Sequence, residues 1–188
     1  MRAALAILAL MAVVPARARA GEAVLYVGDS LGVGTVRQLR SSTAPGALDF
    51  DTRVGRGSTE GLAVLDSKLR RRHKIVVFDL GTNDASAQLL EQNLRRARTL
   101  SGECLLIVFT LNKPGAGPFN TVIRAFARSA DNVLLVDWHS TAARGHLLAR
   151  DGIHASPSGY RRRAALVNAL IRGARQARWA AARTLNAR

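Results

Sequence analysis

The chain has 188 residues, of which 48% are hydrophobic and 22% charged, and its formal net charge at pH 7 is +15. This length is usual for one domain, and the hydrophobic content is enough to bury a core, which excludes an intrinsically disordered protein. A single cysteine, Cys104, excludes an internal disulfide. Because this cysteine opens an apolar run, we expect a buried strand residue rather than a reactive thiol.

The first twenty residues differ in composition from the rest of the chain. A basic residue is followed by an uninterrupted apolar run, 3–14. Residues 18–20 (Ala-Arg-Ala) have the small-x-small pattern that precedes a signal-peptidase cleavage site. The apolar run is shorter than the roughly 20 residues that span a bilayer. We therefore predict a secretory signal peptide at 1–20, with a retained membrane anchor as the alternative. The domain at 21–188 is then expected to be secreted or periplasmic, in the cell envelope, with no transmembrane span.

Apolar runs alternate with helical patterns along the remaining chain, without an internal repeat or an interdomain linker. Strands are expected at 23–27, 48–54, 75–80, 105–110 and 133–136. Helices are expected around 34–40, 59–72, 86–100 and 119–128, and a last helix from near Ser158, with a flexible loop at 113–118. This alternation predicts an α/β fold: a doubly wound, flavodoxin-like, three-layer α/β/α arrangement around a five-stranded parallel sheet of order 2-1-3-4-5.

Three short motifs lie in order along the chain. Residues 28–31 (Gly-Asp-Ser-Leu) follow the first expected strand, residues 81–84 (Gly-Thr-Asn-Asp) follow the third, and residues 151–154 (Asp-Gly-Ile-His) precede the last helix. In the order 2-1-3-4-5 the second and third strands flank the first, and ligands bind beyond the carboxyl ends of the strands. We therefore expect Ser30, Asn83 and the loop after the second strand to converge at one edge of the sheet.

The residue types in these motifs suit nucleophilic catalysis. Ser30 is the candidate nucleophile, and His154 is the candidate base that takes its proton. Asp151 can orient the imidazole and stabilise the imidazolium. The amide of Asn83 can donate a hydrogen bond to the negative oxygen of a tetrahedral intermediate. An isolated Asp-x-x-His is more often an ordinary turn, but three ordered motifs together favour an active site.

Together the motifs resemble those of the SGNH, or GDSL-type, serine esterases and acyltransferases, from about Val24 to the last helix. The resemblance implies that the oxyanion hole combines the Asn83 side chain, the backbone amide of Ser30 and that of a glycine after the second strand. For that glycine we prefer Gly55, with Gly57 as the alternative.

The other polar residues of the chain are assigned no chemistry. Short polar side chains commonly stabilise turns and cap helices, which is the role expected for the remaining motif residues, Asp29, Thr82 and Asp84. The other histidines are His73, His139 and His146, and their positions do not show the spacing of metal ligands. No phosphate-binding glycine loop is present, so we expect neither a metal nor a nucleotide cofactor.

The resemblance implies an enzyme that cleaves an oxygen ester through an acyl-Ser30 intermediate, which water then hydrolyses, and the predicted signal peptide implies that this enzyme is secreted. Its substrate would be an acylated small molecule or an envelope glycan. Residues 54–56 and 137–138 look similar to cell-wall O-acetyltransferase domains within the family, which points toward O-acetyl esters. Such domains often adjoin a membrane domain that supplies acyl groups, and no such apolar segments occur here. An esterase is therefore expected, with an O-acetyltransferase acting on envelope glycan as the alternative.

The positive net charge of the chain has two interpretations, a binding surface for an anionic partner or a solvated basic face. Basic runs at 70–74 and 161–163 could attract anionic envelope polymers, although a solvated basic face is an equally good interpretation. Nucleic acid is not the partner that we expect, because aromatic residues for base stacking make up only 5% of the chain. A non-catalytic, basic envelope-binding module is the competing hypothesis from a different class of protein.

Overall fold

A computed structural model describes residues 23–43 and 46–186, with side chains up to residue 177. The segment predicted to be a signal peptide, 1–20, lies outside the described residues. Five parallel strands form one sheet in the order β2-β1-β3-β4-β5. The strands are β1 (Ala23–Gly28), β2 (Leu48–Thr52), β3 (His73–Asp79), β4 (Leu105–Phe109) and β5 (Val133–Val136). The predicted fold class and strand order are confirmed.

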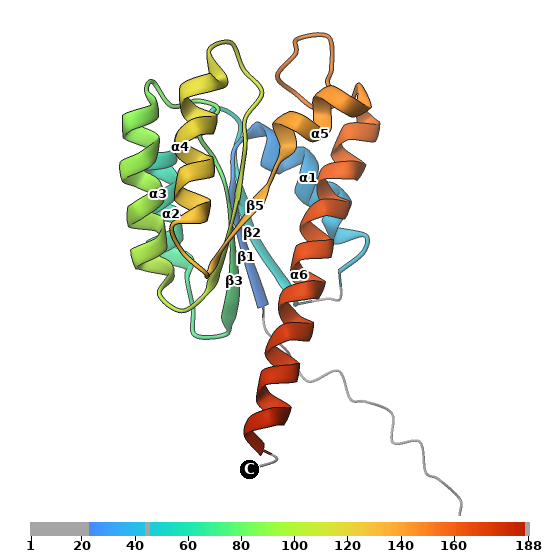
Figure 1. Ribbon diagram of the computed structural model, residues 1–188. Coiled ribbons are helices and arrows are strands. Elements are labelled where there is room, and N and C mark those ends of the chain that lie inside the picture. The colour runs from blue at the N-terminus through green and yellow to red at the C-terminus, as the bar shows by residue number, and fades with distance from the viewer. Residues whose placement is uncertain (1–22, 44–45, 187–188) are drawn as a thin grey trace, which may run out of the picture.

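Helices cover both faces of this sheet (Figure 1). They are α1 (Ser30–Arg40), α2 (Ser58–Lys68), α3 (Ala87–Ser101), α4 (Ala116–Arg128), α5 (Trp138–Gly145) and α6 (Pro157–Asn186). In Figure 1, α2, α3 and α4 lie on one face, and α1, α5 and α6 lie on the other. The chain thus forms the expected three layers. None of the helices in the described part of the chain has the length and apolar character needed to cross a membrane.

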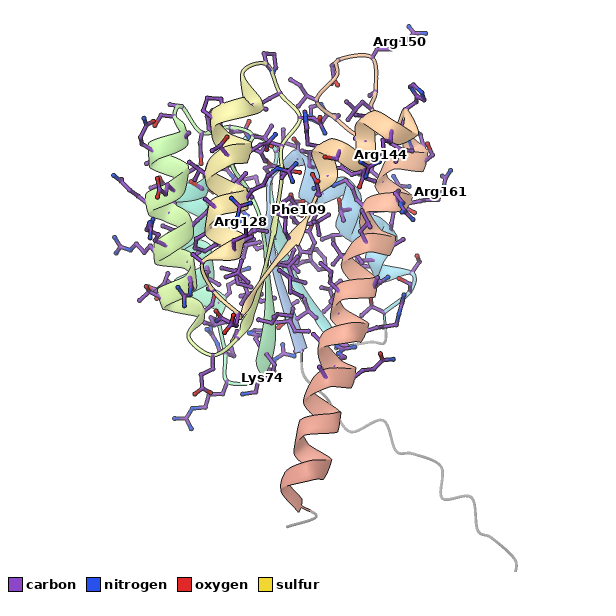
Figure 2. The ribbon with its side chains drawn as sticks, viewed as in Figure 1. Lys74, Phe109, Arg128, Arg144, Arg150 and Arg161 are labelled. Carbon is purple, nitrogen blue, oxygen red and sulfur yellow. The ribbon has the colours of Figure 1, made fainter. Side chains whose placement is uncertain are left out.

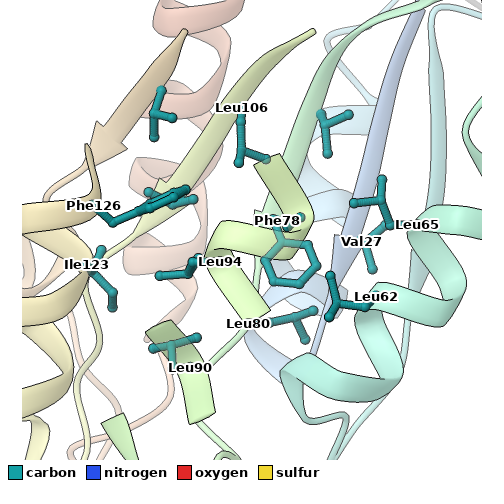
Figure 3. Packing of buried hydrophobic residues seen from close by; sticks show 14 of the residues in the cluster. Val27, Leu62, Leu65, Phe78, Leu80, Leu90, Leu94, Leu106, Ile123 and Phe126 are labelled. Carbon is teal, nitrogen blue, oxygen red and sulfur yellow. The ribbon is translucent and has the colours of Figure 1, made fainter. Parts of the chain in front are cut away.

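Alternating strand side chains divide the core into two halves. On β3, Val76 and Phe78 point into the cluster under α2, α3 and α4, whereas Ile75 and Val77 point into the cluster under α1, α5 and α6. Figure 3 shows Phe78 among leucines of the first cluster. Phe78 is 1% exposed, and truncating such a side chain to alanine costs about 3–5 kcal/mol. The sheet is therefore held from both sides, which fixes the positions of its strand ends.

The helix α1 starts earlier than the sequence predicted, at Ser30 rather than near residue 34. Asp29 caps it by accepting a hydrogen bond from the backbone N–H of Leu31 at 2.8 Å. Gly34, near which the helix was expected to begin, allows close packing: a Cβ added there would lie 2.3 Å from the Tyr160 ring of α6. The nucleophile candidate therefore occupies the first position of a helix that packs directly against α6.

Two further segments differ from the prediction. Helix α5 was not predicted, and its cap is Asp137, whose carboxylate accepts from the Ser140 N–H at 3.3 Å. The segment 113–118 was predicted to be a flexible loop, and this is wrong for its second half, because α4 begins at Ala116. Pro118 is tolerated there because the first turn of a helix has no partner for its N–H groups.

Cys104 lies just before β4 and is partly rather than fully buried. Its thiol donates to the His73 carbonyl at 3.3 Å. The expectation of a buried strand residue is therefore only approximately met.

Candidate active site

The carboxyl ends of the strands lie at the top of Figure 1, and the loop before α6 reaches the same end of the molecule. In Figure 2, Arg150 marks that loop at the top, while Lys74, near the start of β3, lies at the opposite end. Ser30 lies two residues after the end of β1, and Asn83 follows the end of β3. The strand order thus brings the three motifs of the sequence to one end of the molecule.

Ser30, His154 and Asp151 form a continuous chain of hydrogen bonds. The Ser30 Oγ lies 3.0 Å from His154 Nε2, and His154 Nδ1 lies 2.7 Å from Asp151 Oδ2. The pKa of Asp151 is lowered to about 2, first by the hydrogen bond from His154 and then by two backbone N–H groups. A carboxylate with this pKa is ionised at neutral pH and can only accept. Nδ1 therefore carries the proton of the neutral ring, and Nε2 is free to accept the proton of Ser30.

The Asp151–His154 turn holds its own geometry. Asp151 Oδ1 accepts from the backbone N–H groups of Ile153 and His154, each at 2.9 Å. Gly152 has φ 69°, which a residue with a side chain rarely adopts. The turn is closed by the His154 carbonyl, which accepts from the Ala149 N–H at 2.8 Å. The side chains of His154 and Asp151 are 42% and 48% exposed, so water has direct access to the base.

The Asn83 amide faces the loop after β2. Its Nδ2 donates to the Arg56 carbonyl at 3.1 Å and makes a longer contact, 3.5 Å, with Asp29 Oδ2. The second contact is at the limit of a hydrogen bond and is weak. An anionic oxygen placed nearby could therefore take over that N–H at little cost.

Asp84 and Lys113 fix the loop that carries Asn83. Asp84 Oδ1 accepts from the Ser58 N–H at 2.7 Å, at the start of α2. Lys113 Nζ donates to the carbonyls of Thr82 and Asp84, both at 3.0 Å. The ammonium also lies 3.9 Å from the centre of the Phe119 ring, and burial lowers its pKa. Lys113 was missed by the sequence analysis, since a lysine beside Pro114 looks like an ordinary loop residue.

Gly55 and Gly57 differ in what their positions require. Gly55 is exposed and has φ 76° in a tight turn in which the Arg56 N–H donates to the Arg53 carbonyl at 3.3 Å. Gly57 caps α2, and a Cβ added there would lie 3.2 Å from Asp84 Oδ1. The carbonyl between the two glycines accepts from Asn83. Both candidate glycines thus lie next to the Asn83 amide.

Arg56 joins the ends of the first two strands. Its side chain is almost fully buried, and Nη1 donates to the Gly28 carbonyl at 3.3 Å and to the Asp51 carbonyl at 2.7 Å. Nη2 donates to Asp51 Oδ1 at 2.7 Å. The burial of this arginine was not predicted. Its contacts hold the β2 loop against the segment that leads into Ser30.

Two of the other histidines, His73 and His139, take part in contacts outside the proposed catalytic chain. The buried His73 accepts from the Arg70 N–H at Nδ1 and lies 2.7 Å from Asp49 Oδ2 through Nε2. His139 Nδ1 lies 2.9 Å from Asn112 Oδ1. Within residues 23–43 and 46–186, histidine, cysteine and acidic side chains form no group of three or more that could hold a metal ion.

Asp29 is a buried acid directly beside Ser30. Its pKa is raised to about 7, first by burial and then by repulsion from Asp79, which is also buried. The folded protein therefore binds a proton at Asp29 more tightly than the unfolded chain does. The stability that this proton provides is fully present below about pH 4 and is lost as the pH rises toward about 7.

We predict that Asp29→Asn flattens the pH dependence of stability between about pH 4 and about pH 7, because asparagine keeps an oxygen that can cap α1 but does not titrate. Urea unfolding of the wild type and the variant at a series of pH values measures the effect. Parallel curves for the two proteins over this range would contradict the assignment.

Comparison with solved structures shows which known fold the chain shares. The C-terminal catalytic domain of peptidoglycan O-acetyltransferase A from Streptococcus pneumoniae superposes with a TM-score of 0.71 at 15% identity, covering 83% of this chain and 96% of that one. A GDSL-like lipase from Bacteroides thetaiotaomicron gives 0.70 at 17% identity, with 81% and 89% covered. Phospholipase A1 from Streptomyces albidoflavus gives 0.64 at 15% identity, with 79% and 99% covered. The fold is that of the SGNH hydrolases.

At the level of sequence, the chain is 26% identical over 151 residues to YrhL of Bacillus subtilis, which is named as a proposed peptidoglycan O-acetyltransferase. The match covers 77% of this chain but only 23% of YrhL. No protein-family model matches the chain. The resemblance to SGNH proteins that the motifs indicated is thus confirmed by the fold and by this relative.

Proposed function

We propose that this protein is a secreted serine esterase that cleaves O-acetyl esters through an acyl-Ser30 intermediate. The observation that carries the proposal is the chain of hydrogen bonds from Ser30 through His154 to the ionised Asp151, with distances of 3.0 and 2.7 Å. A serine hydroxyl becomes an effective nucleophile when a neighbouring base accepts its proton and a third group orients that base. These side chains have the arrangement that both conditions require.

In the proposed reaction, Ser30 Oγ bonds to the ester carbonyl carbon while its proton moves to His154 Nε2. The intermediate then collapses, the bond from the carbonyl carbon to the alcohol oxygen breaks, and His154 returns the proton to the leaving alcohol. A water molecule repeats the sequence on the acyl-serine and releases the carboxylic acid. Asp151 stays ionised throughout and stabilises the imidazolium.

The oxyanion would be stabilised by Asn83 Nδ2 and by backbone amides. The N–H of Ser30 is suited to this because the first N–H groups of a helix have no partner within the helix. For the glycine amide we retain Gly55. Since the described residues contain only trans peptide bonds, the Gly57 N–H points opposite to the Arg56 carbonyl and hence away from the Asn83 amide. Gly57 is the poorer choice for that reason.

The substrate assignment rests on the relatives. YrhL and the Streptococcus pneumoniae domain are named for peptidoglycan O-acetylation, and a family 3 carbohydrate esterase from Clostridium thermocellum shares the fold with a TM-score of 0.59. Acetyl groups on envelope glycan are therefore the proposed substrate. An envelope location would follow from cleavage of segment 1–20, which the mass of the exported protein would reveal.

Turnover of p-nitrophenyl acetate and of longer-chain esters, followed by acetate release from O-acetylated peptidoglycan, tests the proposal. We expect turnover that depends on Ser30 and is fastest for the acetyl ester. No turnover above that of Ser30→Ala on any of these substrates would favour the binding module. Faster turnover of long-chain esters would favour a lipase.

A transferase is the second candidate, favoured by the names of YrhL and the Streptococcus pneumoniae domain. We favour hydrolysis because the half-exposed base leaves the acyl-enzyme open to water, whereas a transferase must exclude water from it. Incubation with an activated acetyl ester and a glycan acceptor distinguishes the two. Free acetate as the main product supports the esterase, and acetylated glycan as the main product would establish the transferase.

The basic surface predicts salt-sensitive binding to anionic envelope polymer. Basic side chains lie at both ends of the molecule, as Arg150 and Lys74 show in Figure 2. Raising the ionic strength from 0.1 to 1 M shortens the screening length from about 10 Å to about 3 Å. Co-sedimentation with anionic cell-wall polymer should therefore weaken, while turnover of a neutral ester should not change. Retention that is independent of salt would argue against electrostatic recruitment.

A further inference from the structure

A fully buried arginine on α6 connects the segments that carry the proposed catalytic groups. Arg163 is 0% exposed, and its Nη2 donates to both carboxylate oxygens of Asp79, at 2.7 and 2.6 Å. Its Nε donates to Thr35 Oγ1 at 3.0 Å. Arg163 is the last residue of the basic run 161–163, which was interpreted as a surface feature. That interpretation is wrong for this residue, because its guanidinium has no access to a polyanion.

Each contact of Arg163 leads to one part of the site. Thr35 is in α1, and its hydroxyl donates at 2.8 Å to the carbonyl of Leu31, the residue after Ser30. Asp79 ends β3, shortly before Asn83, and its carbonyl accepts from the N–H of Asp29 at 3.2 Å. Arg163 itself belongs to the helix that follows the Asp151–His154 turn. One guanidinium thus bridges the nucleophile helix, the strand leading to Asn83 and the helix after the base.

The surroundings of the guanidinium leave it little freedom. It lies over the rings of Phe109 and Trp138, 4.5 and 4.9 Å from their centres. The Tyr26 hydroxyl donates to Asp79 Oδ2 at 2.7 Å and fixes the carboxylate from the other side. A buried ion pair is a poor source of stability, since well-packed apolar residues of similar volume often stabilise as well or better. Core stability alone therefore does not account for an arginine here, whereas directional hydrogen bonds to two different elements do.

We propose that Arg163 is a positioning residue that holds Ser30, Asn83 and His154 in register through its contacts with Asp79 and Thr35. The proposal rests on the proposed function and adds the residue that aligns its parts. A methionine at this position fills similar space but makes neither contact. A lysine keeps a charge for Asp79, but its ammonium lacks the planar fork that lets arginine reach two acceptors in fixed directions. The effect should therefore be largest in Arg163→Met and intermediate in Arg163→Lys.

The test compares Arg163→Met and Arg163→Lys with Arg162→Met, which removes the exposed neighbouring arginine of the same helix. The thermal transition of each variant is recorded first, and kcat and KM for the acetyl ester are measured well below it. Sulfonylation of Ser30 by an alkylsulfonyl fluoride, followed by intact mass, reports on the nucleophile without an ester substrate. We expect Arg163→Met to lower kcat by about 10²-fold, as a misplacement of about 1 Å does, with KM little changed. Sulfonylation should slow in parallel, and Arg162→Met should match the wild type.

A folded Arg163→Met with wild-type kcat and sulfonylation would overturn the inference while leaving the proposed function intact. If Arg163→Met does not fold, Thr35→Val keeps the shape of the side chain but removes its contact with Arg163 Nε, together with the hydrogen bond that the hydroxyl donates to the Leu31 carbonyl. Thr35→Val and Arg163→Lys should then both lower kcat, and wild-type rates in both would overturn the inference equally. A wild-type protein without ester turnover or sulfonylation would instead refute the proposed function, and the inference with it.

Discussion

Replacing Ser30 with alanine should reduce ester turnover by about 10⁴-fold or more while the protein remains folded. The side chain supplies the atom that forms the acyl bond, and its Oγ lies 3.0 Å from the proposed base. The cap of α1 is the Asp29 side chain, which this substitution leaves in place. Initial rates with p-nitrophenyl acetate, together with circular dichroism of the variant, measure both parts of the expectation.

His154→Ala should have an effect of similar size, because nucleophile and base act as a unit and the loss of either stops the attack. Combining the two substitutions should add little for the same reason. Asp151→Asn should be less severe, since it retains the serine and the imidazole but removes the charge that orients the ring. Wild-type turnover by purified Ser30→Ala would refute the nucleophile assignment and the mechanism built on it.

Replacing Asn83 with alanine should lower kcat by about 10²- to 10³-fold, which is typical of losing one donor of an oxyanion hole. The charge on the carbonyl oxygen develops in the transition state, so KM should change little. Steady-state kinetics separate the two parameters. Asn132→Ala is a suitable control. The Asn132 amide also donates to backbone carbonyls, those of Gly102 and Cys104. Asn132 precedes β5, however, and so lies at the opposite end of the sheet from the proposed site.

An unchanged kcat with a raised KM in Asn83→Ala would show instead that the amide contacts the ground-state substrate. Because Asn83 Nδ2 donates to the Arg56 carbonyl at 3.1 Å, the substitution can also affect the stability of the protein. If the variant loses stability as well as kcat, the amide also holds the β2 loop. The thermal transition of Asn83→Ala therefore belongs with its kinetics.

The fold was predictable because its strongest signals are local. Continuous apolar runs such as 105–109 can only be buried strands or buried helix segments, and their alternation with helical patterns selects a parallel sheet. The convergence of Ser30 and Asn83 followed from strand order alone, without any contact being known. The early start of α1 was not predicted, because the close contact between Gly34 and the Tyr160 ring joins residues far apart in the chain and leaves no local signal.

The burial of Arg163 was harder to predict, although a signal existed. Tyr160, Arg163, Ala164, Val167 and Ile171 recur at the spacing of one helix face, which places the arginine on the apolar side. The run of three arginines was interpreted as one basic surface, although its last member faces inward. Long-range partners such as Asp79 leave no local trace in the sequence, and so the network beneath the serine emerged only from the fold.

The Asp151–His154 pair and the Ser30–His154 pair depend on very different parts of the protein. The first is set within a single turn, whereas the second joins residues 124 positions apart and depends on how α6 packs on α1. Substitutions in the core can therefore separate serine from histidine while the Asp-x-x-His turn persists unchanged. The presence of Asp-x-x-His in a related sequence therefore indicates only that the turn is retained. Whether that protein is an active enzyme depends on the distance between its histidine and its serine.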